Sequence, residues 1–146
     1  MRVLAPVFEK TRVSVVFSGH VHNYQRTHPL RFLADDPKTH QKHNYMPGRW
    51  TLDRTFDGAL NQQPHGVIYL VSGGGGARLY NTEQHDKPET YQEFTARFVS
   101  NVHSFTVIDA TDDNLSIRQL SDQGAELDRI QIHSSPALAP ASGDSR

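Results

Sequence analysis

The sequence predicts an α/β fold that becomes rich in β-strands toward its C-terminus, and three observations lead to this prediction. A helical pattern at residues 2–10 precedes a short apolar run, VSVVFS, at residues 13–18, which is the order of elements in α/β proteins. A second apolar run, GVIYLVS, occupies residues 66–72. Three further strand patterns, separated by the turn-forming sequences TDDN and SDQG, follow at residues 103–109, 114–120 and 126–132.

The first two elements are expected to be a short helix and a buried strand. Apolar side chains recur at helical spacing in residues 2–10, and Pro6 is compatible with a helix that begins there or is kinked. The run at 13–18 is continuous and β-branched, which is typical of a strand buried on both faces. It ends abruptly at Gly19.

The middle of the chain is expected to be mostly loop. Residues 31–65 are polar and carry several Pro and Gly breakers, and a short helix is predicted at 89–98. Residues 1–133 are expected to form one folded unit, and the Pro-, Ala- and Ser-rich residues 134–146 a disordered tail. Four aromatic residues are available to hold the long loop in place: Phe32, Tyr45, Trp50 and Phe56.

Composition excludes several classes of function. Lys and Arg total 15 and Asp and Glu total 16, so the chain has no excess positive charge for a broad nucleic-acid surface. The absence of cysteine excludes disulfides, thiolate nucleophiles and Cys-based zinc sites. No apolar run reaches the length of a membrane span, and the first residues lack the pattern of a secretory signal, so the sequence leaves the compartment unknown.

One segment, GHVHNYQR at residues 19–26, carries candidate chemistry. It follows the strand at 13–18 directly, and in open α/β sheets ligands bind at the carboxyl ends of strands. If the segment is extended, His20 and His22 lie on one face, about 6.5 Å apart at the backbone. Both imidazoles can then bind one metal ion, or each can bind one ion of a pair. A bare H-x-H pair is also common among solvated loop histidines.

The neighbouring residues leave alternatives open. Gly19 leaves room for a metal or a phosphate near the backbone, and Arg26 offers a planar fork to a phosphate or to a carboxylate. Tyr24 either caps the site or fills the core. His103 precedes a predicted strand and either lines the site or has a structural role. The glycine run at 73–76 either presents amides to a phosphate or packs closely beside the site.

Three blocks of the sequence resemble a known family. FEKTRVSVVFSGHVHNYQRTHPL resembles the last metal-binding motif of the calcineurin-like metallophosphoesterases, in the form found in the purple acid phosphatase branch. GVIYLVSGGGGARLY resembles the strand and Gly-rich turn that follow it, and SFTVIDATDDNLSIRQL resembles the closing β-meander. Together the blocks cover most of residues 3–132 in the family's order. The resemblance implies a mixed αββα sandwich, present here as an incomplete, β-rich C-terminal portion.

The resemblance also implies a chemistry. His20 is similar to the histidine that binds the more exchangeable divalent metal, and His22 to the one that binds the other metal. The implied cofactors are two metal ions, iron together with zinc, manganese or a second iron. The implied reaction is hydrolysis of a phosphate ester by a metal-bound hydroxide. Gly19, Tyr24, Arg26 and His103 are then candidates for contact with substrate or for support of the ligands.

The chain departs from the family in its carboxylate motifs. No Asp-x-His, Gly-Asp-x-x-Asp or Gly-Asn-His sequence is present, and the single Gly-Asp pair lies at 143–144 in the tail. We therefore expect a fragment that is inactive alone, with the N-terminal half of the domain as its partner. Missing strands are expected to leave exposed edges on 13–18 and 66–72. The alternatives are a non-catalytic β-rich interaction module with a vestigial motif and a simple metal-binding domain.

Overall fold

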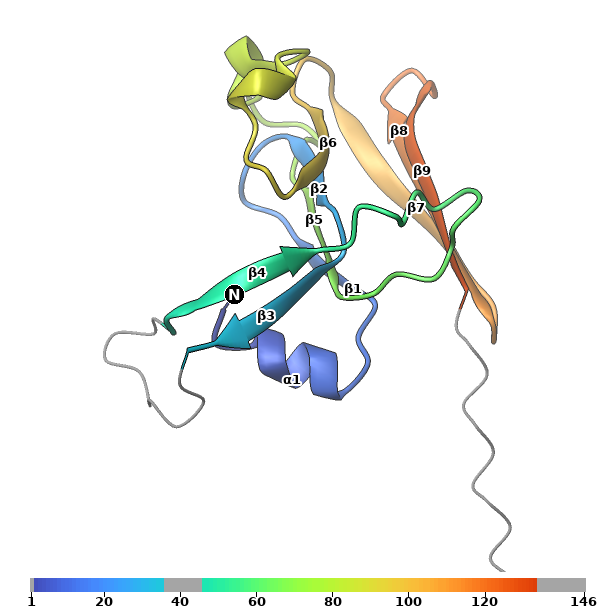
Figure 1. The fold of residues 1–146 in the computed structure, drawn as a ribbon. Coiled ribbons are helices and arrows are strands. Elements are labelled where there is room, and N and C mark those ends of the chain that lie inside the picture. Colours follow the sequence, from blue (N-terminus) through green and yellow to red (C-terminus); the bar gives the residue numbers. More distant parts are fainter. Residues whose placement is uncertain (1, 36–45, 134–146) are drawn as a thin grey trace, which may run out of the picture.

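The computed structural model describes residues 2–35 and 46–133 (Figure 1). In these residues the chain forms one α-helix, two single-turn 3-10 helices and nine strands. The helices are α1 (Ala5–Lys10), η1 (Thr82–Gln84) and η2 (Pro88–Thr90). The strands are β1 (Val15–Ser18), β2 (Tyr24–Thr27), β3 (Leu30–Ala34), β4 (Gly48–Leu52), β5 (Ile68–Ser72), β6 (Thr95–Val99), β7 (Ser104–Ala110), β8 (Asn114–Ser121) and β9 (Glu126–His133).

Strands β1, β5, β2 and β6 form a mixed sheet in that order. β1 and β5 are parallel, and β2 pairs antiparallel with β5 and with β6. The predicted exposed edge is therefore correct for β1 and wrong for β5, since β5 lies between two strands. The prediction that β1 is buried on both faces is also wrong, because its residues are only half-buried or exposed, and Phe17 remains 42% exposed.

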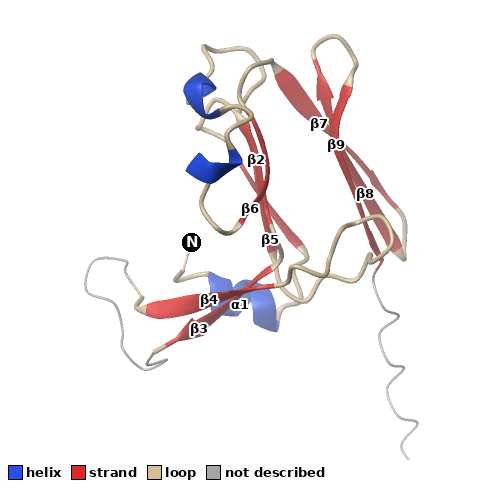
Figure 2. Cartoon of the chain, turned by 45° about the horizontal axis from the view of Figure 1, so that its top comes forward, coloured by secondary structure: helices blue, strands red, loops and turns tan. Residues whose placement is uncertain are grey.

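Strands β7, β8 and β9 form an antiparallel meander, as the sequence predicts. The TDDN turn closes through a 2.8 Å bond from the amide of Thr111 to the carbonyl of Asn114. The SDQG turn closes between Ser121 and Gly124, whose amide donates to Ser121 O at 2.9 Å and whose φ of 84° suits glycine. The meander lies beside the four-stranded sheet as a second layer (Figures 1 and 2).

The core lies between these two sheets. Alternating residues of β5, Ile68 and Leu70, are fully buried, as period-2 alternation requires of the side that packs on another layer. Buried isoleucines of β8 and β9 belong to the same cluster, so the two sheets share one core. The cluster comprises Tyr24, Phe56, Ile68, Leu70, Val99, Ile117, Ile130 and Ile132.

Two sequence predictions in the middle of the chain need correction. Residues 31–65 are not one loop, because β3 and β4 pair as a hairpin in which Phe32 contacts Trp50 at 4.9 Å between ring centroids. Phe56 joins the core, as expected of an anchoring aromatic residue, whereas Tyr45 lies outside the described residues. The helix predicted at 89–98 is wrong, since only its first two residues lie in the single-turn helix η2 and residues 95–98 belong to β6. The predicted tail at 134–146 also lies outside the described residues.

The predicted N-terminal helix is confirmed, in shortened form. α1 begins at Ala5 with Pro6 in its first turn, where a missing amide hydrogen costs nothing. Its last turn is joined to the β3–β4 hairpin because the amide of Phe32 donates to Glu9 Oε1 at 2.5 Å. No helix among the described residues has the length and apolar character needed to cross a membrane.

Candidate functional site

The GHVH segment forms a tight loop between β1 and β2. The amide of Val21 donates to Gly19 O at 2.9 Å, and the amide of Asn23 donates to Val21 O at 2.8 Å. His20 has a φ of 71°, in the left-handed region that non-glycine residues seldom occupy. The segment is therefore not extended, so the sequence-based estimate of the histidine spacing, which assumed β geometry, does not apply. Such backbone strain is retained mainly where the surrounding structure fixes it.

The start of the glycine run packs closely against the backbone of this loop. The amide of Gly73 donates to Asn23 O at 3.0 Å, and a Cβ built on Gly73 would lie 2.0 Å from Val21 O. Only glycine fits there. Of the two alternatives that the sequence left open for this run, the contacts at Gly73 show close packing. The amide of Tyr80 also donates to His22 O at 2.9 Å, so the loop is held on two sides.

The ring of His22 has a defined orientation and tautomer. Its Nδ1 lies 2.9 Å from the carbonyl oxygen of Arg78, which accepts only, so Nδ1 carries a proton, and in the neutral form of the ring Nε2 keeps a free lone pair. The ring stacks on Tyr80, with centroids 4.2 Å apart and planes inclined by 21°. Metal-binding histidines usually donate their second ring nitrogen to a carbonyl or carboxylate in this way. The orientation of the His22 ring is therefore compatible with a cation at Nε2.

His20 and His103 flank this arrangement differently. The ring of His20 is exposed and makes no hydrogen bond within the described residues. His103 directs Nδ1 at the carbonyl of Gly74, at 3.1 Å, so it has the same tautomer as His22. The amide of Ser104 donates to the same carbonyl at 3.1 Å. The glycine run therefore adjoins both the motif loop and the start of β7.

Tyr24 and Arg26 face the meander and bind Asp128 of β9. Arg26 donates through Nε to Asp128 Oδ2 at 2.6 Å and through Nη2 to Oδ1 at 3.1 Å. The Tyr24 hydroxyl donates to Oδ2 at 2.8 Å. The two side chains of the ion pair are only 11% and 10% exposed. Of the alternatives left open by the sequence, the fork of Arg26 holds a carboxylate and Tyr24 lies in the core.

The pKa values of both Tyr24 and Arg26 are raised, and both shifts keep these groups protonated as hydrogen-bond donors. Burial raises the pKa of Tyr24, and the neighbouring Asp128 raises it further, so the phenol stays protonated and continues to donate. Burial acts to lower the pKa of Arg26, but its hydrogen bonds and charge interaction with Asp128 prevail and raise it. Sequence analysis missed Asp128. The sequence feature that could have identified it is the alternation of side chains along β9, which places Asp128 on the same inward face as Ile130 and Ile132.

The described residues contain no complete metal site. Among residues 2–35 and 46–133, no group of three or more His, Asp or Glu side chains is arranged to hold a metal ion. The tautomer of His22 fits metal binding, and the donor set around it is too small for a closed site. The roles predicted for His20 and His22 therefore stay predictions.

Comparison with known proteins relates the chain to phosphatases. No family model matches it. The chain is 34% identical over 77 residues to a nucleotide pyrophosphatase/phosphodiesterase of Hordeum vulgare, covering 52% of this chain and 16% of that protein. It is 38% identical over 72 residues to an uncharacterized protein of Mycobacterium tuberculosis, covering 49% of this chain and 12% of the relative. It is 34% identical over 76 residues to a probable inactive purple acid phosphatase of Arabidopsis thaliana, covering 52% of this chain and 10% of the relative.

A solved structure supports the fold. The purple acid phosphatase PPD1 from seeds of yellow lupin, Lupinus luteus, superposes with a TM-score of 0.57 over 89% of this chain and 19% of the lupin chain, at 21% sequence identity. The match confirms the predicted fold class, a mixed and sheet-rich portion of a metallophosphoesterase fold. The matches to named relatives confirm the resemblance to purple acid phosphatases. In each case the chain spans less than a fifth of the protein it matches.

Proposed function

We propose that this chain is the C-terminal metal-binding part of a binuclear metallophosphoesterase that hydrolyses phosphate esters. The observation that supports this most directly is the ring of His22, whose Nδ1–H is bound by the carbonyl of Arg78 at 2.9 Å. This bond fixes the tautomer and leaves Nε2 free to bind a cation. A solvated loop histidine has no need of a fixed tautomer or of a stacked partner such as Tyr80.

The residues of the loop have distinct roles in this proposal. His22 binds one metal through Nε2, and the exposed ring of His20 binds the second. Gly19 leaves space beside them, because a Cβ added there would meet nothing within 4 Å. Bound metals would supply the activation of a water molecule and the neutralisation of phosphate oxygens. His103 is proposed to support the site from the start of β7, and Tyr24 and Arg26 to position the loop through Asp128.

Completion of the site requires carboxylates from a further segment. Two imidazoles offset none of the charge of two metal ions, and the described residues contain no cluster of three donors. The free edge of β1 lies immediately before the loop and has no second neighbour among the described strands. We propose that the partner is the N-terminal half of a metallophosphoesterase domain, and that the present chain is inactive without it.

Metal titration tests the proposal. The full chain is titrated with Zn²⁺ and Mn²⁺ by calorimetry and by NMR of the imidazole Nε2 resonances. We expect weak binding that shifts His20 and His22, and that is lost in the His20→Ala, His22→Ala double variant. His133→Ala is the matched control, because this exposed histidine lies at the end of β9 in the other sheet. Binding that is unchanged in the double variant would refute the assignment.

Activity tests the need for a partner. We expect no hydrolysis of p-nitrophenyl phosphate by the chain with metals alone, and restored hydrolysis when a segment bearing the carboxylate motifs is added. Turnover by the unaccompanied chain with two bound metals would contradict the proposed dependence on the partner, while leaving the metal assignment in place.

The second candidate function is a non-catalytic interaction module with a vestigial metal motif. Two observations favour it: the incomplete donor set of the described residues, and the description of the Arabidopsis relative as probably inactive. This function predicts a stable fold that does not bind metal ions. The calorimetric titration of the unmodified chain therefore separates the two candidates.

A further inference from the structure

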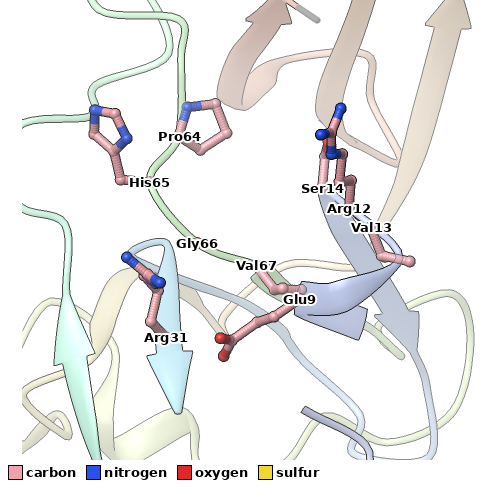
Figure 3. A pocket seen from close by; sticks show the side chains of 9 residues that line it. All are labelled: Glu9, Arg12, Val13, Ser14, Arg31, Pro64, His65, Gly66 and Val67. Atoms are coloured by element: carbon pink, nitrogen blue, oxygen red, sulfur yellow. The ribbon is translucent and has the colours of Figure 1, made fainter. Parts of the chain in front are cut away.

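A concave site lies away from the histidine loop, at the opposite end of strand β1. It is a pocket of about 360 Å³, bounded by the end of α1, the turn into β1, strand β3 and the segment before β5. Figure 3 shows Arg31 and His65 toward one side of the pocket and Arg12 with Ser14 toward the other. Three separate elements therefore contribute nitrogen-bearing side chains to one concavity.

The topology separates this pocket from the proposed metal site. β1 and β5 are parallel, so the N-terminal ends of both strands lie at the same end of the sheet. The pocket is lined by residues that precede β1, Val13 and Ser14, and by residues that precede β5, Gly66 and Val67. The histidine loop follows the end of β1. The length of β1, about 13 Å at some 3.3 Å per residue, lies between the two sites.

Backbone hydrogen bonds fix the walls of the pocket. The turn after α1 is closed by a 2.9 Å bond from the amide of Val13 to Phe8 O. The segment before β5 is paired to β3 by two bonds between Leu30 and Val67, at 2.9 and 2.8 Å. The amide of His65 donates to Asp53 Oδ2 at 2.9 Å. Such walls would hold a ligand without first having to become ordered.

The charges of the pocket favour an anion. Arg12 and Arg31 are exposed, and neither guanidinium forms an ion pair within the described residues. The one lining carboxylate, Glu9, accepts the amide of Phe32 and is partly neutralised by that bond. Two guanidinium groups against one carboxylate leave a net positive charge. Guanidinium groups bind oxyanions bidentately, through two parallel hydrogen bonds.

We infer that this pocket binds a phosphate-type oxyanion without a metal, at the edge of the sheet opposite the histidine loop. Arg31 approaches the anion from one side and Arg12 from the other, and Ser14 offers a hydroxyl donor beside Arg12. The inference does not depend on the proposed phosphoesterase function, because its residues, its position and its chemistry are separate from those of His20 and His22.

An NMR titration with inorganic phosphate in the presence of EDTA tests the inference. Chelation removes metal-dependent binding at the histidine loop, so only a metal-free site is observed. We expect saturable shifts of the amides of Arg12, Ser14, His65 and Gly66. The same shifts should appear in the His20→Ala, His22→Ala double variant, which makes this result independent of the proposed metal site.

Charge variants decide whether the pocket is responsible. Arg31→Gln and Arg12→Gln should each weaken phosphate binding at least about tenfold, since each removes a charge-assisted hydrogen-bond donor. Glu9→Gln should strengthen it, because the amide oxygen still accepts from Phe32 while the opposing charge is removed. Arg129→Gln is the matched control, with the same change of net charge on the far side of the meander, and it should leave binding unchanged.

Three outcomes would overturn the inference. One is an absence of saturable shifts at the pocket in the folded full chain. Another is equal weakening by Arg129→Gln and Arg31→Gln, which would indicate only a general effect of net charge. The third is phosphate binding that requires metal or is abolished by the histidine double variant, which would assign the anion to the other site.

Discussion

The two larger sheets among the described residues differ in the distance along the chain between the strands that they pair. The meander pairs strands that follow one another in sequence, and its strands are seven or eight residues long. The sheet that carries the histidine loop pairs strands from distant segments, such as Val15 with Ile68, and its strands have four or five residues. Local turns determine the first sheet, and long-range contacts determine the second.

This difference shows where the candidate site gets its geometry. The histidine loop leaves a short edge strand, so the strand pairing of β1 alone does not fix it. Its order comes instead from the glycine run and from the Tyr24–Arg26–Asp128 cluster, which joins β2 to the meander. The meander therefore supports the sheet that carries the histidine loop.

The largest expected effect comes from removing that support. Asp128→Ala leaves a buried guanidinium and a buried phenol without their acceptor, and removal of one partner of a buried ion pair costs about 3–5 kcal/mol. We expect the free energy of unfolding, measured in urea, to fall by about this amount. We also expect the His22 resonances to broaden, since Arg26 follows the loop directly.

A surface pair on the same strand provides the control. Glu126 and Arg129 form an ion pair whose side chains are 40% and 49% exposed, so Glu126→Ala should change stability little. Equal losses in Asp128→Ala and Glu126→Ala would mean that the buried cluster does not join the two sheets energetically.

A smaller effect is expected from Gly73→Ala. The new Cβ would lie 2.0 Å from Val21 O. Neither atom can move without its backbone, so the loop must shift. Overpacking of this kind costs about 1–3 kcal/mol. Urea denaturation measures the loss, and metal titration measures the displacement of His20 and His22. Gly75→Ala is the control, since its Cβ meets nothing within 4 Å. Full metal binding by Gly73→Ala would show that the glycine run does not position the loop.

Alkaline pH should act on the histidine-bearing sheet before the meander, which contains no tyrosine in residues 104–133. Burial, with a contribution from Glu9, raises the pKa of Tyr69 from 10.0 to about 12. Below 10.0 both states hold the proton. Above it the unfolded chain ionises first, so stability should fall as pH rises from 10.0 to about 12.

Tyr69→Phe should reduce this loss, and Glu9→Gln should reduce it by a smaller amount because Glu9 is the lesser cause. Denaturation midpoints measured across the interval give the slope for each variant. An unchanged slope in Tyr69→Phe would assign the alkaline loss to other groups.

The same contrast explains which parts of the fold the sequence predicted. The meander was predicted strand by strand, because hairpin turns and alternation are local signals. Strand β2 was missed, because its pattern in YQRT depends on Arg26 being buried against Asp128, a partner 102 residues away. The β3–β4 hairpin was read as loop because breakers surround it, although Phe32 and Trp50 were identified as anchoring residues.

The sequence identified candidate residues for the site, whose roles stay predictions, but it did not predict the geometry of their loop. Its position after β1 followed from the apolar run that ends at Gly19. The left-handed φ of His20 and the bond from His22 to Arg78 depend on the chain returning 56 residues later, which no local pattern encodes. The prediction that β1 is buried on both faces failed because a continuous apolar run indicates a strand suited to burial and does not show whether both of its faces are covered.

The smallest expected effect on stability concerns this uncovered strand. Phe17 of β1 is 42% exposed at the sheet edge, so Phe17→Lys should cost about 1 kcal/mol or less. A lysine on an edge strand opposes edge-to-edge pairing, so we expect self-association in analytical ultracentrifugation to decrease. Phe105→Lys in β7 is the control, because Phe105 is similarly exposed at 48% in the meander. If both variants reduce self-association equally, exposed phenylalanine rather than the open edge of the histidine-bearing sheet drives it, and the contrast between the two sheets loses its main consequence.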